Sequence, residues 1–141
     1  MKTLAVDHGQ KRLGLAISDE TGTLARPLVV IKHVSRIVDA ATVTERAAAH
    51  DVAQIIVGVS YNEEGALNPA GQSAARFADA LRLQTDLPVT LWDESMTTQD
   101  AQFARLTMGV SRKKRSGHLD DVAAAVLLQN YLDVQSSIQN R

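Results

Sequence analysis

The sequence contains no cysteine and few aromatic residues. Its 141 residues include two Phe, two Tyr and one Trp. The absence of cysteine excludes disulfide bonds, thiolate metal ligands and a thiol nucleophile. Because aromatic side chains are scarce, we expect a core built mainly from Ala, Val, Leu and Ile.

A strong charge of one sign and long apolar runs are also missing. With 15 basic and 16 acidic residues the net charge is −1, so attraction to nucleic acid would require a local basic patch. No apolar run approaches the roughly 20 residues that span a bilayer, and charges come too early for a signal peptide. We therefore expect a cytoplasmic protein that does not bind membranes.

The composition is that of one folded domain. Hydrophobic residues make up 45% and charged residues 22% of the chain, which is ordinary for a globular protein. We assign residues 1–135 to a single domain and residues 136–141 to a polar C-terminal tail.

Hydrophobic periodicity predicts strands and helices in an informative order. The expected strands are 2–7, 12–18, 24–32, 53–58 and 88–92. The expected helices are 35–50, 69–85, a short one from residue 97 or 98 to about 108, and 118–132. Pro27 predicts an edge position or a bulge for the third strand. Three strands joined by tight turns form an antiparallel meander, and the following helices and strands add parallel crossovers. The order predicts an α/β fold of ribonuclease H-like plan, a mixed five-stranded sheet with helices on both faces.

Three acidic residues lie at the ends of regular segments. Asp7 follows an apolar strand, Glu94 follows the last strand, and Asp120 opens the last helix. Three carboxylates brought together there would repel one another unless a hard divalent cation bound to their oxygens. The pattern therefore predicts a site for one or two Mg²⁺ or Mn²⁺ ions. Such sites commonly catalyse the hydrolysis of a phosphodiester.

Each acid also has an ordinary explanation as a turn residue, a solvated charge or a helix-terminal charge. We expect Asp93 to cap the turn after its strand, which leaves Glu94 as the ligand. Asp120 is in helical register with Ala123, Ala124, Leu127 and Tyr131, an apolar stripe expected to face the sheet. The corresponding stripe for Asp121 runs into Gln129 and Asp133 and is more polar.

Basic residues near these acids are candidates for binding phosphates. A dense basic run could be a solvated loop or a flexible phosphate clamp. His118 could protonate a leaving group. The predicted nucleic-acid-binding residues are Lys11, Arg12, Arg112, Lys113, Lys114 and Arg115.

Residues 7–14 also match the phosphate loop of the actin and sugar-kinase superfamily. That superfamily needs two such domains around a cleft, whereas this chain has room for one. An ATPase is therefore disfavoured.

Several separate motifs, taken in order, resemble the YqgF family, also called RuvX. These are small bacterial ribonuclease H-like proteins described as Holliday-junction resolvase homologues and pre-16S rRNA nucleases. The motifs that carry the resemblance are residues 7–19, 25–28, 56–58, 87–89, 92–94, 97–98 and 119–133.

The resemblance implies an Asp–Glu–Asp metal site, which maps onto Asp7, Glu94 and Asp120. It also implies cleavage at the 5′ end of precursor 16S rRNA during ribosome biogenesis. Branched DNA is the competing substrate, and a non-catalytic ribosome-assembly factor that binds nucleic acid is a further alternative. We expect a monomer or a weak homodimer.

The chain departs from the family pattern at two places. It has Val59-Ser60 where the family commonly has Leu-Pro, and Ser95 where the family commonly has arginine.

Overall fold

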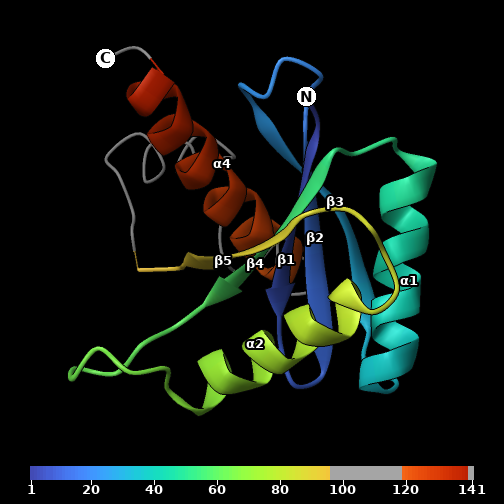
Figure 1. The fold of residues 1–141 in the computed structure, drawn as a ribbon, viewed down its shortest axis with the longest axis vertical. Helices are drawn as coiled ribbons and strands as arrows, with labels where there is room; N and C mark the ends of the chain where they lie inside the picture. Colours follow the sequence, from blue (N-terminus) through green and yellow to red (C-terminus); the bar gives the residue numbers. More distant parts are fainter. Residues whose placement is uncertain (96–118, 140–141) are drawn as a thin grey trace.

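A five-stranded mixed sheet forms the centre of the molecule (Figure 1). The computed structural model describes residues 1–95 and 119–139, except for the side chains of 119–121 and 139. The strands are β1 (Thr3–His8), β2 (Arg12–Ser18), β3 (Ala25–Lys32), β4 (Gln54–Val59) and β5 (Val89–Asp93). Their order is β3-β2-β1-β4-β5. β2 pairs antiparallel with β1 and β3, whereas β4 pairs parallel with β1 and β5. The predicted fold class is confirmed.

The parallel pairing brings the carboxyl ends of β1, β4 and β5 to one edge of the sheet. β4 lies between the other two, and all but its first residue are buried, as its continuous apolar run predicts. Pro27 lies in the edge strand β3, beside a register irregularity between Leu15 and Ala16 of β2. Both features predicted from Pro27 are therefore present.

Helices cover both faces of the sheet (Figure 1). α1 (Arg36–Ala49) and α2 (Pro69–Arg82) pack on one face, and α4 (Leu119–Gln139) packs on the other. Ser35 caps α1 by accepting a hydrogen bond from the backbone of Val38. Asn68 caps α2 in the same way, and Pro69 occupies the first helical position, where its missing N–H costs nothing.

Two cores result from the alternation of side chains along the strands. In β1, Leu4 and Val6 lie in the core beneath α1 and α2, whereas Ala5 lies in the core beneath α4. The same alternation assigns Asp7 to the α4 face and His8 to the α1/α2 face. Consecutive residues at the end of one strand therefore serve opposite faces of the sheet.

Helix α4 differs from its prediction in two respects. It continues to Gln139, because no glycine or proline after Leu132 stops it. Ala124, Leu127 and Tyr131 are buried as predicted, but Ala123 is exposed since the buried face is centred on Ala124, Ala125 and Leu128. The predicted short helix to residue 108 lies outside the described residues. None of the described helices is long and apolar enough to cross a bilayer.

Candidate functional site

The carboxyl groups of Asp7 and Glu94 meet at the carboxyl edge of the sheet, within hydrogen-bonding distance. The strand register explains the contact. Val6 of β1 pairs with Val57, and Gly58 pairs with Trp92 of β5. Asp7 is therefore level with Gly58, and Glu94 follows two residues after Trp92 on the same face. The backbone N–H of Glu94 donates to Val59 O at 2.9 Å, which holds the segment after β5 against β4.

Gly58 provides the space through which Glu94 reaches Asp7. β1 and β5 are separated by one strand, a span of roughly 9–10 Å. A Cβ atom on residue 58 would lie 2.8 Å from Glu94 Oε1, 2.9 Å from Glu94 Cγ and 2.9 Å from Leu127 Cδ2. The Glu94 side chain thus lies across the position in β4 that has no side chain.

The electrostatic setting of the pair favours a bound proton or cation. Burial raises the pKa of Glu94, the hydrogen bond with Asp7 acts in the opposite direction, and the charge of Asp93 raises it again. Two carboxyl groups in contact cannot both be ionised cheaply, so a proton or a cation must lie between them.

Asp93 has the local role that the sequence predicts. Its Oδ1 accepts hydrogen bonds from the backbone N–H of Ser95 at 2.9 Å and from the Ser95 hydroxyl at 2.7 Å. Ser95, where the family commonly has arginine, therefore closes this turn. Ser60, at the second departure from the family pattern, also makes a structural contact, because its hydroxyl donates to Asn68 Oδ1 at 2.8 Å.

Asp120 lies in the first turn of α4, and its side chain is outside the described part of the chain. Where side chains are described, the structure has no group of three His, Asp or Glu residues able to hold a metal. The described contribution to the predicted site is thus the pair Asp7 and Glu94. Their oxygen atoms, which are in contact, are the donor type that Mg²⁺ and Mn²⁺ prefer.

Basic residues lie beside this edge of the sheet. Lys11 and Arg12, at the start of β2, line a shallow hollow together with Val30 and Lys32. Arg12 and Lys32 are partners across the β2–β3 ladder. Sequence reasoning missed Lys32, although its place at the end of the strand paired with β2 could have indicated it. The predicted basic run at residues 112–115, and His118, lie outside the described residues.

A histidine cluster on the α1/α2 face was also missed. His8 stacks on Phe77 with ring centroids 4.8 Å apart, and burial lowers the pKa of His8 while the charge of Asp39 raises it. His33 Nδ1 lies 2.5 Å from Asp39 Oδ2. Sequence spacing gave no signal for this cluster, because His33 follows β3, and β2 lies between β3 and β1, which ends at His8.

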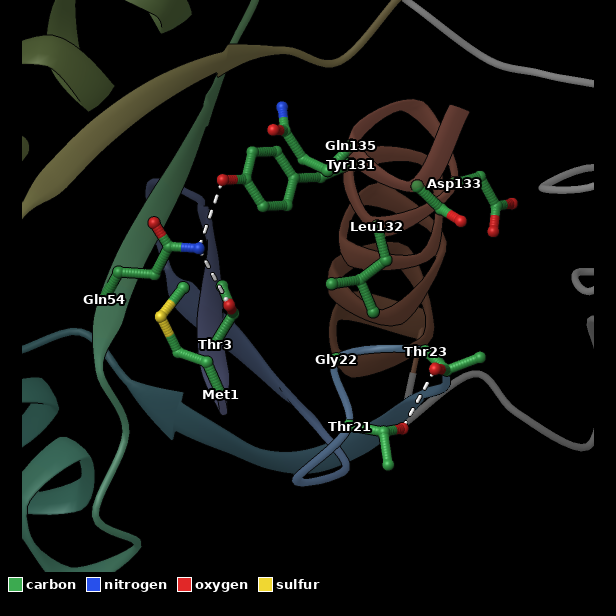
Figure 2. Close-up of a pocket in the computed structure, with 11 residues that line it drawn as sticks. Met1, Thr3, Thr21, Gly22, Thr23, Gln54, Tyr131, Leu132, Asp133 and Gln135 are labelled. Carbon is green, nitrogen blue, oxygen red and sulfur yellow. Dashed lines mark hydrogen bonds between the residues drawn. The ribbon is translucent and has the colours of Figure 1, made fainter. Parts of the chain in front are cut away.

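A polar cavity of about 290 Å³ lies at the opposite end of the sheet (Figure 2). The amide of Gln54 donates there to the hydroxyls of Thr3 at 3.0 Å and Tyr131 at 3.1 Å. Thr3 and Gln54 are at the amino ends of β1 and β4, so this cavity is separate from Asp7 and Glu94.

Comparison with known proteins agrees with this architecture. A family model described as "RuvX: Holliday junction resolvase" matches residues 1–134. A protein of Thermoanaerobacter pseudethanolicus named "Putative pre-16S rRNA nuclease" is 39% identical over 138 residues, covering 97% of this chain and 99% of the relative. A relative of the same name from Geobacillus kaustophilus is 42% identical over 135 residues, with 94% and 98% covered.

Solved structures show the same fold at low identity. T. thermophilus RuvC in complex with Holliday junction substrate superposes with a TM-score of 0.61 at 17% identity, with 96% of both chains covered. The Fowlpox virus resolvase bound to Holliday junction DNA gives a TM-score of 0.57 at 14% identity, with 96% of this chain and 99% of that chain covered. The family match and the names of these relatives support a nuclease role, a hydrolase acting on nucleic acid. The chain belongs to the RuvX family.

Proposed function

We propose that this protein is a metal-dependent nuclease whose substrate is the 5′ end of precursor 16S rRNA, and that it acts in the cytoplasm during ribosome biogenesis. The observation that carries the proposal is the contact between the carboxyl groups of Asp7 and Glu94 across Gly58. The names of the curated relatives support the choice of substrate.

Asp7, Glu94 and Asp120 are the proposed ligands for Mg²⁺ or Mn²⁺. When bound, a divalent cation supplies an activated water and stabilises charge on the leaving oxygen. Asp7 and Glu94 come from separate strands held in register by β4, so their carboxyl oxygens are positioned before metal binds. Lys11 and Arg12 neutralise substrate phosphates, and the basic residues 112–115 are proposed to do the same.

Cleavage of a four-way DNA junction is the second candidate activity. The description of the family model and the fold shared with junction resolvases favour it. Both candidates use the same carboxylates, so they differ in the nucleic acid that is positioned against them.

The test compares end-labelled rRNA precursor and a four-way DNA junction, each with Mg²⁺, with Mn²⁺ and with EDTA. We expect metal-dependent cleavage that Asp7→Asn abolishes while binding is retained, since Asn keeps the shape but loses the charge. Asp79→Asn, which removes an exposed acid in α2, is the matched control and should cleave normally. The preferred substrate decides between the two activities.

The proposed role of Asp120 has its own matched control in the next residue. Asp120→Asn should abolish cleavage and weaken Mn²⁺ binding, whereas Asp121→Asn should retain both. If the folded wild-type protein binds either substrate but cuts neither, the nuclease proposal fails and a non-catalytic assembly factor takes its place.

A further inference from the structure

A second hollow lies at the same edge of the sheet as Asp7, but on the α1/α2 face. Its volume is about 330 Å³, and its lining includes His8, Gly9, His33, Ser35 and Arg36. This volume is at the lower end of the range for small-ligand sites, roughly 300–1,000 Å³. Because His8 directly follows Asp7, the hollow and the carboxylate pair are on opposite sides of one strand end.

A buried carboxylate fixes His33 at the wall of this hollow. Asp39 is 1% exposed; its Oδ2 lies 2.5 Å from His33 Nδ1, and its Oδ1 accepts the backbone N–H of Val34 at 3.0 Å. With Nδ1 engaged, Nε2 is the ring nitrogen that remains for a ligand. Both oxygens of Asp39 are also engaged, so the hollow presents the guanidinium of Arg36 and Nε2 of His33 rather than a carboxylate.

The hollow lies next to the basic edge formed by β2 and β3. Lys32 precedes His33, and the backbone N–H of His33 donates to Lys11 O at 2.9 Å. Residues 8–18 and 30–38 contain no Asp or Glu. In a chain with a net charge of −1, this is the local positive patch that binding a polyanion requires.

We propose that this hollow is a phosphodiester-binding subsite, in which Arg36 and His33 bind a phosphate of the nucleic-acid strand that neighbours the bond held at Asp7 and Glu94. The subsite rests on the proposed function. Arg36 supplies a guanidinium suited to phosphate oxygens, and the His33 ring, held in place by Asp39, adds Nε2–H as a second donor in its protonated form. The ligand class is a nucleic-acid backbone, either RNA or DNA, read without regard to base sequence.

The test measures binding of a fluorescent 12-nucleotide single-stranded RNA, and its DNA counterpart, in EDTA across a series of salt concentrations. Arg36→Gln should weaken binding roughly three- to tenfold and reduce the slope of log K against log salt by about 0.7, the value for one lost phosphate contact on a single strand. Arg46→Gln removes the same charge from the other end of α1 and should change neither. His33→Gln is a second variant, expected to weaken binding in the same direction.

A backbone scan locates the contact on the ligand. Single methylphosphonate linkages are placed at successive positions of the 12-mer, so that each probe lacks one phosphate charge. One position should weaken binding to the wild type but not further weaken binding to Arg36→Gln, because the two changes remove the same interaction.

Equal affinity and equal salt slope for the wild type and Arg36→Gln, with thermal unfolding unchanged, overturn the subsite. Because binding is measured in EDTA, the result is independent of cleavage. If the wild type cuts no substrate but Arg36→Gln binds nucleic acid more weakly than the wild type, the subsite stands and the nuclease proposal falls. If the wild type cuts and Arg36→Gln binds as tightly as the wild type, the subsite alone falls.

Discussion

Replacing Gly58 by alanine tests whether the missing side chain in β4 places Glu94. The added Cβ would lie 2.8 Å from Glu94 Oε1, and ordinary contact begins at 3.4 Å, so Glu94 must retreat by about 0.6 Å or swing away. Leu127 Cδ2, at 2.9 Å, closes the other side of the space. Overpacking of this kind costs about 1–3 kcal/mol. We expect a value near the lower end, because Glu94 is exposed and its side chain can move toward solvent.

The effect on cleavage should be much larger than the effect on stability. Displacing a catalytic group by about 1 Å can cost roughly 100-fold in rate. We therefore expect Gly58→Ala to lower kcat roughly 10- to 100-fold, with KM for nucleic acid within about twofold, since the basic residues on β2 and β3 are untouched. Isothermal titration with Mn²⁺ should show weaker binding than in the wild type.

A matched variant separates displacement of Glu94 from a general loss of stability. Val57→Ala alters the preceding residue of β4, whose side chain lies in the core on the opposite face, and its cost in folding free energy should be at least as large. Val57→Ala should retain kcat per folded molecule. Wild-type Mn²⁺ affinity and wild-type kcat in Gly58→Ala would refute the reasoning that Gly58 places Glu94.

Two further predictions concern stability. Burial raises the pKa of Glu94, so the folded state binds the proton of this carboxyl group more tightly than the unfolded state does. The stability of the metal-free protein therefore falls as the pH rises from the ordinary pKa of Glu through the raised pKa of the folded state. Glu94→Gln should therefore unfold at a higher temperature than the metal-free wild type at pH 7. The difference should disappear below pH 4. Mg²⁺ should reduce it at pH 7 by stabilising only the wild type. Gln129 is 8% exposed; its amide accepts the N–H of Ala25 at 2.9 Å and donates to Thr23 O at 2.9 Å. Gln129→Leu leaves both backbone groups unpaired and should cost about 1–3 kcal/mol in urea unfolding, without changing kcat per folded molecule.

The fold follows from the sequence because its local patterns agree with one another. Period-two apolar segments, tight turns and a proline at an edge strand all favour the same meander, and the continuous apolar run of β4 favours a central parallel strand. The end of α4 was less predictable. Polar residues such as Ser136 and Ser137 do not stop a helix by themselves, and the sequence offers no glycine or proline that would.

The site was predictable only in part. Asp7 and Glu94 could be chosen because both follow apolar strands whose carboxyl ends share an edge. The pairing of His33 with Asp39, by contrast, depends on how the start of α1 packs beside the end of β3. No periodic pattern encodes that packing, so the histidines look scattered in the sequence.

The course of α4 along β4 bears on the third proposed ligand. The Tyr131 hydroxyl contacts Gln54, the first residue of β4, whereas Leu127, one turn earlier in the helix, lies against Gly58 near the strand's carboxyl end. Moving toward the start of α4 therefore leads toward the edge where Asp7 and Glu94 meet. Asp120 is seven residues, or about two turns, before Leu127 and on the same flank of the helix. Asp121 is instead in line with Leu128 near the middle of the buried face, so the more polar stripe expected for Asp121 is wrong. What distinguishes the two acids is that Asp120 lies on the flank of α4 where Leu127 contacts Gly58, and this is the physical reason to expect different outcomes from the two Asn variants.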